Sequence, residues 1–196
     1  MCIRDRHKAR LVADGHLTDI PLNSVYAGVV SIRGMRICLF LGELNGMEAY
    51  ATDIGNAYLE AITLEKVCIR AGPEFGNLEG HLLIIYKALY GMRSSGKQFG
   101  DLLADCLKKE GFIPSRAEPQ IFMRRQGDLW EYIATYVDDL LIVSHQPLEI
   151  LETLQSEPYN FKLKGSGPIS FHLGCGFTRD KHNVLCMDPK KYIEKM

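Results

Sequence analysis

Two adjacent carboxylates in the segment YIATYVDDLLIVS carry the clearest chemical signal in the sequence. Asp138 and Asp139 interrupt a stretch of residues that would otherwise be buried. Apolar alternation before the pair and an apolar run after it predict two short strands, 132–137 and 140–143, joined in a tight hairpin. Like charges on a buried hairpin repel and raise each other's pKa, so the tip either lies in water or holds a metal ion.

A third carboxylate, Asp53, ends another predicted strand. The segment MEAYATDI (47–54) alternates enough for a strand, and Asp53 is its last polar residue before a Gly-Asn turn. If this strand neighbours the hairpin in one sheet, the three acids converge on one edge. They could then hold two divalent cations about 3.5–4 Å apart, the arrangement that assists in-line phosphoryl transfer. Mg²⁺ suits such all-oxygen ligands. Taken without Asp53, the Asp138–Asp139 pair could also be an acidic turn exposed to water.

The elements around these acids predict an α+β protein, with a sheet backed by helices. Helices are expected at 24–44, 95–110 and 148–156, and further strands at 67–72, 81–91, 119–125 and, as a pair, around 171–187. The first helix should be mostly buried through the stripe Val25, Val29, Ile32, Phe40 and Leu44. Because strands and helices are mixed without a regular βαβ repeat, an α+β sheet backed by helices is favoured.

Composition bounds the class of protein. The 196 residues are 46% hydrophobic and 24% charged, without an internal repeat or a linker, so one domain spanning 1–196 is expected. No run approaches the roughly 18 apolar residues of a membrane span and the N-terminus lacks a signal-peptide pattern, which predicts an intracellular protein without a membrane partner. Six cysteines without a C-x-x-C pair give no support to redox chemistry.

A competing hypothesis from another class rests on His172, Cys175, His182 and Cys186. Their spacing, H-x2-C-x6-H-x3-C, could belong to a zinc-binding hairpin in a nucleic-acid-binding module that is not an enzyme. Against zinc, His172 and Cys175 have opposite parity along one strand, which would point their side chains to opposite faces.

Six short segments occur in an order that resembles the successive motifs of the reverse transcriptase domain of copia-type LTR retrotransposons. They are KARLVADG at residue 8, DIGNAYLE at 53, KALYGMRSSG at 87, GFIPSRAEPQIFMRR at 111, YVDDLLIV at 136 and FHLGC at 171. The resemblance runs from about residue 8 to the end of the chain, and residues 1–7 match nothing in the family. Each motif alone is weak, but six in the right order are a specific signal.

The resemblance implies a right-hand polymerase fold with fingers and palm, an antiparallel palm sheet backed by helices, and the thumb missing. A protein of this fold adds dNTPs to a primer 3′-OH on an RNA or DNA template. The resemblance implies that Asp53, Asp138 and Asp139 are catalytic and, with the backbone carbonyl of Ile54, ligate two Mg²⁺ ions, with Mn²⁺ as a possible substitute.

The resemblance also implies substrate contacts on the fingers side. Lys8 and Arg10 match a strand whose cations hold the incoming triphosphate, since phosphate recognition needs mobile or forked positive charge. Tyr58 occupies the position of an aromatic gate that excludes a 2′-OH, although core packing explains a lone Tyr equally well. The segment that in the family packs beside the nascent base pair and template strand includes Tyr90, Gly91 and Arg93.

The family context further implies flanking integrase and ribonuclease H regions of a parent polyprotein and a cytoplasmic retroelement particle. The chain departs from the family at 94–97, where Gln and Pro are commoner, and at Asp14, where a basic residue is usual. A decayed, non-catalytic remnant is an alternative to an active enzyme, because one sequence shows no selection, and the intact acids argue mildly against it.

Overall fold

The computed structural model describes residues 11–15 and 24–194. The chain divides into two compact units, one formed by 1–27 with 58–102 and the other by 28–57 with 103–196. The predicted phosphate-binding residues Lys8 and Arg10 lie outside the described residues.

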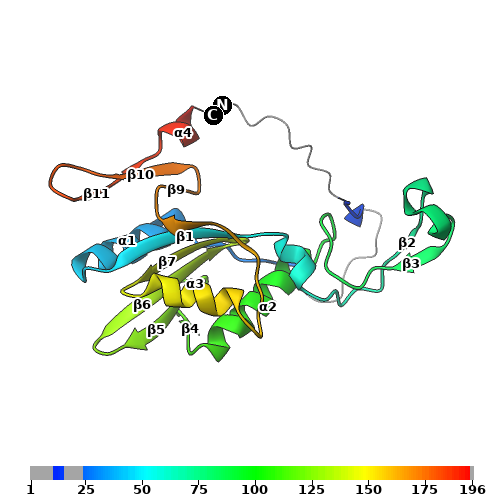
Figure 1. Cartoon of the computed structure of the whole chain (residues 1–196), viewed down its shortest axis with the longest axis horizontal. Coiled ribbons are helices and arrows are strands. Elements are labelled where there is room, and N and C mark those ends of the chain that lie inside the picture. The colour runs from blue at the N-terminus through cyan, green and yellow to red at the C-terminus, as the bar shows by residue number, and fades with distance from the viewer. Residues whose placement is uncertain (1–10, 16–23, 195–196) are drawn as a thin grey trace. The chain divides into compact units, whose positions relative to one another are not determined.

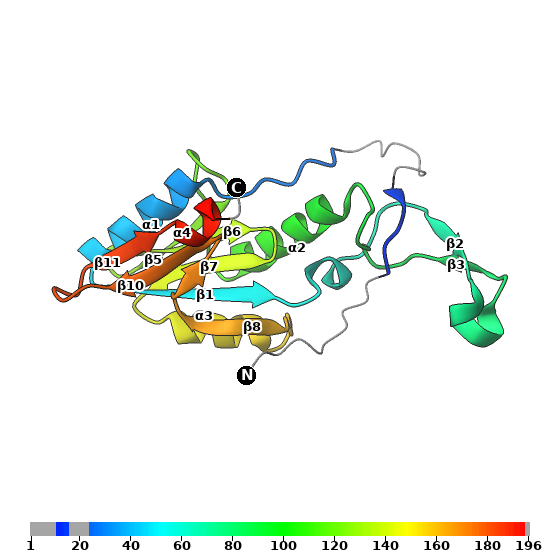
Figure 2. The same ribbon diagram turned by 90° about the horizontal axis from the view of Figure 1, so that it is seen from above.

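A six-stranded antiparallel sheet forms the second unit, with strand order β4-β5-β6-β7-β1-β8. The strands are β1 (Glu48–Ile54), β4 (Ile113–Pro114), β5 (Ile121–Gln126), β6 (Leu129–Tyr136), β7 (Asp139–Ser144) and β8 (Leu163–Pro168). Strand β1 comes first in the chain, yet it lies between β7 and β8, and Figure 2 shows these three strands side by side. This order places the end of β1 beside the β6–β7 hairpin. The expected α+β class, an antiparallel sheet backed by helices, is confirmed.

Helices α1 (Ile32–Leu44) and α3 (Pro147–Gln155) lie on opposite sides of this sheet (Figure 1). Helix α1 begins at a cap, because the Ser31 hydroxyl accepts a hydrogen bond from the Gly34 N–H at 3.0 Å. A methyl group added to Gly42 would collide with Val143 of β7, so the helix approaches the sheet closely at that glycine. Strand β7 is buried from Leu140 to Ser144, which leaves Asp139 as its only half-exposed residue.

The predicted helix at 24–44 is wrong in its start and in its buried face. The Val30 N–H donates to the Thr135 carbonyl at 2.9 Å, so the chain is tied to the sheet hairpin just before the Ser31 cap, and the helix begins only at Ile32. The residues buried on α1 are Met35, Cys38 and Leu39. The five residues of the predicted stripe, Val25, Val29, Ile32, Phe40 and Leu44, are all exposed. The sequence carries two apolar stripes on this helix, and periodicity alone does not say which one faces the sheet.

Helix α2 (Ser95–Lys109) matches its predicted range of 95–110 to within one residue. Its second half belongs to the second unit, where Leu103, Cys106 and Leu107 are buried. Helix α3 also matches its prediction at 148–156 closely. These two helices succeed as predictions because each carries a single apolar face.

A small second sheet, of order β11-β10-β9, follows in the same unit. It comprises β9 (Phe171–His172), β10 (Cys175–Arg179) and β11 (Leu185–Asp188), and α4 (Lys190–Ile193) packs on β10. Cys175 and Phe177 share one buried cluster with Met35 and Leu39 of α1. The predicted strand pair at 171–187 is therefore three strands.

Strand β8 is absent from the sequence-based expectations. Its sequence, LKGSGP, contains two glycines and a proline, a composition typical of a turn. The strand forms because it pairs with β1, with Lys164 opposite Asp53 and Leu163 opposite Ile54. Tertiary pairing overrides local composition here.

A buried ionic network lies at the Ser144 end of β7. Glu131 is only 1% exposed, and its carboxylate accepts hydrogen bonds from Arg124 Nε at 2.6 Å and from Ser144 Oγ at 2.7 Å. Arg124 also donates to the Glu110 carbonyl at 2.9 Å, and its guanidinium lies 4.4 Å from the centre of the Phe112 ring. The charge of Glu131 is thus fully compensated inside the fold.

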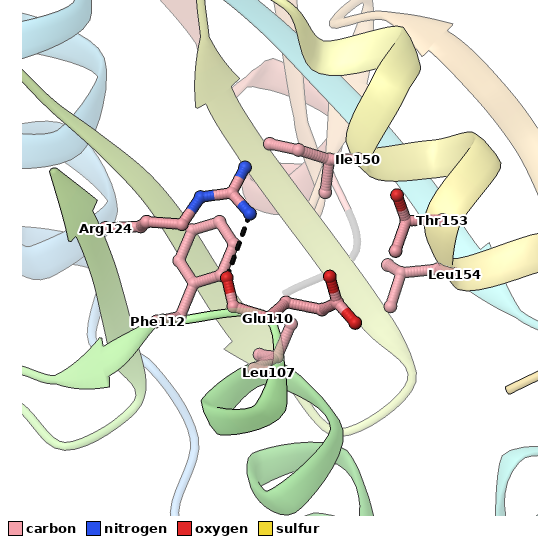
Figure 3. A pocket seen from close by; sticks show the side chains of 7 residues that line it. All are labelled: Leu107, Glu110, Phe112, Arg124, Ile150, Thr153 and Leu154. Carbon is pink, nitrogen blue, oxygen red and sulfur yellow. Dashed lines mark hydrogen bonds between the residues drawn. The ribbon is translucent and has the colours of Figure 1, made fainter. Parts of the chain in front are cut away.

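Beside this network lies a small cavity, shown in Figure 3, of about 10 Å³. It is lined by Leu107, Glu110, Phe112, Arg124, Ile150, Thr153 and Leu154. A space of this size holds about one water molecule and is far too small for a nucleotide. It is a packing defect between α2, α3 and β5 rather than a substrate site.

The first unit contains the two-stranded sheet of β2 (Cys68–Arg70) and β3 (Leu82–Ile84), which confirms the strands expected within 67–72 and 81–91. Two 3₁₀ helices, η2 (Ala57–Glu60) and η3 (Pro73–Leu78), flank β2 along the chain. Residues 11–15 lie against the segment after β3, where the Ala13 N–H donates to the Tyr90 carbonyl at 2.7 Å. In the described part of the chain, no helix has the length and hydropathy needed to cross a bilayer.

Candidate active site

Asp53 and Asp139 stand directly opposite each other where β1 pairs with β7. Directly opposed residues in an antiparallel pair project to the same face, with Cβ atoms about 4.5–5.5 Å apart. The Ile54 N–H donates to the Asp138 carbonyl at 2.8 Å, which ties the hairpin tip to the end of β1. The structure therefore brings Asp53 next to Asp138 and Asp139, which follow it by 85 and 86 residues in the sequence.

The acids extend a buried row of side chains. Side chains alternate along a strand, so Asp139 shares its face with Leu141 and Val143, which belong to the core cluster under α1. By the same alternation, Asp53 shares its face with Ala49, a residue packed at the margin of that cluster. Asp53, Asp138 and Asp139 are each half-buried, so they stand where the covered part of the sheet gives way to solvent.

The turn that carries Asp138 is as short as a hairpin allows. Tyr136 and Asp139 are paired across β6 and β7, so only Val137 and Asp138 form the loop. Val137 has φ of +55°, a left-handed conformation that β-branched residues rarely adopt and that costs about 1–3 kcal/mol. A two-residue loop between paired strands fixes the backbone of both aspartates relative to the sheet.

The pKa of the Asp139 carboxyl is raised to about 6. Burial is the largest cause, followed by repulsion from Asp138 and then from Asp53. The charged form of Asp139 is thus disfavoured by its surroundings, and a bound cation would reverse that preference.

As donors, these carboxylates fit a hard divalent cation, because all are oxygen ligands, two near strand ends of fixed register and one in the turn beside them. Within 11–15 and 24–194, however, no group of three or more His, Cys, Asp or Glu side chains is already gathered closely enough to hold a metal ion. The acids therefore fit Mg²⁺ in chemistry and backbone placement, while their side chains are not drawn together as a finished metal site.

The residues of the zinc hypothesis do not converge. His172 and Cys175 are paired partners on β9 and β10, so the expectation that they share one strand and face opposite ways is wrong. Cys186, however, pairs with Thr178, whose parity on β10 is opposite to that of Cys175. Cys175 is buried whereas Cys186 is exposed, as expected for opposite faces of the small sheet. The four side chains consequently form no single ligand set.

His172 itself is a buried residue of the core. Burial lowers its pKa to about 4, and its Nε2 atom has no hydrogen-bond partner. The ring is therefore neutral at physiological pH.

In the first unit, the predicted gate residue Tyr58 belongs to a group of aromatic rings. Its ring centre lies 4.8 Å from that of Tyr90 at an interplanar angle of 47°, and 6.4 Å from that of Phe99 in an edge-on arrangement. Phe99 is fully buried, while Tyr58 and Tyr90 are half-exposed. Core packing, the other explanation for Tyr58, is thus present on one side of its ring.

Gly91 and Arg93 hold the chain of the first unit in place near Tyr90. Gly91 has φ of +89°, and a methyl group added there would collide with the Ala13 carbonyl oxygen. Arg93 Nε donates to the Gly15 carbonyl at 2.8 Å. The residues that the family resemblance assigns to substrate contact, Tyr90, Gly91 and Arg93, therefore also fix the segment 11–15 that follows Lys8 and Arg10 in the sequence.

Lys164 is a charged residue at this site that was not among the predicted site residues. It is the β8 residue opposite Asp53 on β1. Its Nζ atom lies 2.7 Å from the position that a Cβ atom would take on Gly55, so the ammonium group covers that glycine. The only signal in the sequence was the K-x-K pattern at 162–164, because β8 itself was not predicted.

Comparison with known families and proteins gives a consistent result. A family model described as reverse transcriptase (RNA-dependent DNA polymerase) matches residues 2–196, a range that includes most of the segment 1–7 that matched no motif. The Retrovirus-related Pol polyprotein from transposon RE1 of Arabidopsis thaliana is 26% identical over 193 residues, which cover 96% of this chain and 13% of that protein.

Two further relatives agree. The Retrovirus-related Pol polyprotein from transposon RE2 of Arabidopsis thaliana is 25% identical over 174 residues, 87% of this chain and 12% of that protein. The putative transposon Ty5-1 protein of Saccharomyces cerevisiae is 25% identical over 145 residues, 73% of this chain and 47% of that protein. This chain thus spans about an eighth of the two polyproteins and less than half of the yeast protein. Together with the order of its motifs, these matches show that the chain belongs to the reverse transcriptase family, as a reverse transcriptase domain of copia-type retrotransposons.

Proposed function

We propose that this chain is the fingers-and-palm part of an RNA-directed DNA polymerase, which adds dNTPs to a primer 3′-OH on an RNA or DNA template. The observation that carries the proposal is the pairing of Asp53 with Asp139 on neighbouring strands, beside Asp138 in the turn. Membership of the reverse transcriptase family supports this class of reaction.

In this proposal two Mg²⁺ ions, replaceable by Mn²⁺, are held by Asp53, Asp138 and Asp139 with the Ile54 carbonyl. When bound, such a pair of ions lowers the pKa of the primer hydroxyl and neutralises charge on the triphosphate. The task of the protein is to hold carboxylates in register, which the β1–β7 ladder supports. Asp139 must be ionised to act as a ligand, so metal affinity should rise as the pH passes about 6.

The substrate contacts in the proposal belong to the first unit. Lys8 and Arg10 bind the triphosphate, and Tyr58 excludes a 2′-OH from the sugar pocket. The contacts of Tyr58 with Tyr90 and Phe99 support the gate, because a side chain that discriminates by size must not move aside. Tyr90, Gly91 and Arg93 contact the nascent base pair and template.

The wider context is part of the same proposal. Two relatives carry the name Pol polyprotein, and this chain covers only a fraction of either. We therefore expect flanking integrase and ribonuclease H regions in the parent protein and a location in cytoplasmic retroelement particles. A non-catalytic remnant of an element is the competing function, and it predicts no activity in the assay below.

Primer extension on a homopolymeric RNA template with a DNA primer and Mg²⁺ tests the reaction. Asp139→Asn keeps the side-chain volume and removes one ligand charge, so extension should fall at least about 10³-fold with the fold intact by circular dichroism. Asp128→Asn is the matched control, since Asp128 occupies the β5–β6 turn of the same sheet and is fully exposed. Undiminished extension by the Asp139 variant would refute the assignment.

The sugar gate has its own test. Tyr58→Val shortens the side chain, so the ratio of ribonucleotide to deoxyribonucleotide incorporation should rise, by about 10-fold or more. An unchanged ratio would remove Tyr58 from the sugar pocket and leave it as a packing residue.

A further inference from the structure

The outward face of α1 carries an apolar stripe that no described part of its unit covers. Ile37, Phe40 and Leu44, which we call the outer stripe, are 50%, 63% and 66% exposed. Their spacing puts them on one helix face, since positions three, four and seven apart are neighbours on a helix. The opposite face is already buried through Met35 and Leu39. A surface helix normally turns a polar face to water, so an apolar stripe on both sides points to a second contact.

Charges of opposite sign flank the outer stripe. Arg36 and Glu43 are seven residues apart, so they lie on the same side of the helix, one toward each end. Glu43 accepts two hydrogen bonds from Arg179 of β10, at 2.6 and 2.8 Å, which hold its carboxylate in place. A carboxylate has about four acceptor positions, so Glu43 can accept a second cation as well.

This arrangement is complementary to itself. If two α1 helices pack antiparallel about a two-fold axis near Phe40, Arg36 of each copy faces the partner's Glu43. The outer stripes then pack against each other along the middle of the contact. A two-fold interface requires this kind of self-complementary patch, because the same surface serves both copies. An unrelated partner would need its own matching pattern of apolar and charged residues.

We propose that the outer stripe of α1 is an interface through which two copies of this chain pair, with their α1 helices antiparallel. The 13-residue helix is about 20 Å long, so one helix pair buries less than the roughly 1,600 Å² of a standard interface. The association is accordingly weak, with a dissociation constant of about 10–100 µM. It does not depend on the proposed polymerase activity.

Sedimentation equilibrium of the full chain between about 5 and 500 µM tests the proposal. The apparent mass should rise with concentration from 22.1 kDa toward twice that value. Phe40→Glu should hold the chain at the monomer mass throughout, since it places two carboxylates at the centre of the interface. Leu148→Glu is the matched control: Leu148 is a 57% exposed apolar residue on α3 of the same unit, and its replacement should leave association unchanged.

Exchanging the charges of Arg36 and Glu43 tests the antiparallel arrangement of the two α1 helices. Arg36→Glu and Glu43→Arg should each weaken self-association about 10-fold, because each variant carries like charges on the flank. An equimolar mixture of the two should associate as well as the original chain, since an acidic flank then meets a basic one. A chain that stays monomeric at all concentrations would overturn the proposal, as would association that Phe40→Glu leaves intact. A mixture that associates no better than its components would overturn the antiparallel pairing.

Discussion

The two ends of strand β7 each carry a carboxylate site, and the fold treats the two in opposite ways. At one end, Glu131 of β6 is buried against Arg124 and Ser144, so each oxygen of its carboxylate has a donor. At the other end, Asp139 is half-buried among acids, and repulsion from Asp138 and Asp53 adds to burial in raising its pKa. Both sites belong to the same sheet, a few residues apart along one strand.

The difference separates a structural acid from a functional one. A buried acid with its counter-charge leaves no capacity for a ligand, and removing either partner exposes an uncompensated charge. A group of acids held at fixed register against their own repulsion costs stability in the free protein and gains most from a cation. The Glu131 end therefore serves the fold, whereas the Asp139 end suits binding.

The largest expected effect comes from removing the carboxylate at the compensated end, that of Glu131. Glu131→Ala leaves Arg124 without its carboxylate and Ser144 without its acceptor, so the free energy of unfolding should fall by about 3–5 kcal/mol. Urea denaturation followed by circular dichroism measures this loss. Asp105→Ala serves as the control, because the Asp105–Lys108 pair is exposed on both sides and should contribute less than about 1 kcal/mol. Equal losses in the two variants would contradict the structural role of Glu131.

A smaller effect, of opposite sign, is expected at the other end. The pKa of Asp139 lies above its ordinary value of 3.8, at about 6, so the stability linked to this carboxyl is present below pH 4 and lost as the pH rises through 6. Asp139→Asn removes the repulsion. In the presence of a chelator, its melting temperature should exceed that of the original chain at pH 8 by about 2–5 °C and equal it at pH 4. A variant less stable at pH 8 would show that a nearby cation, such as Lys164 opposite Asp53, compensates the charge of Asp139.

The smallest expected effect on stability concerns the turn at the acidic end of β7. Val137 is left-handed, so Val137→Gly should relieve backbone strain, partly offset by the greater freedom of glycine in the unfolded chain. We expect a net gain of about 1 kcal/mol in the free energy of unfolding. Thermal or urea denaturation measures it, and a loss of similar size would mean that the Val137 side chain packs well enough to outweigh the strain.

The acids and their strands were predictable because the signal is local. Alternation around residues 47–54 and 132–137, with the apolar run at 140–143, predicted all three strands, and the Asp-Asp pair marked the turn. That β1 lies next to β7 did not follow from alternation, which says nothing about which strands pair. It was a condition of the hypothesis, and the observed register of Asp53 with Asp139 meets it.

The failures share a physical cause. Strand β8 has the composition of a turn and forms only because β1 offers it an edge, so Lys164 was not placed opposite Asp53. Helix α1 has two apolar faces, so periodicity chose the wrong one as buried. The His172–Cys175 pair was misjudged because a two-residue turn, Leu173–Gly174, separates residues that were taken as one strand. In each case contacts between elements, whether near or distant in the chain, decided what the local pattern left open.

Binding of Mn²⁺ by the isolated chain tests the central claim most directly, because it requires neither template nor activity. Titration followed by electron paramagnetic resonance at pH 7.5 should show binding that Asp53→Ala and Asp139→Asn each weaken at least about 10-fold, while Asp128→Asn leaves it unchanged. Affinity should also fall as the pH is lowered through about 6, where Asp139 takes up a proton. If Asp53→Ala binds Mn²⁺ as tightly as the original chain, Asp53 and the Asp138–Asp139 pair do not share a cation, and the proposed polymerase site is contradicted.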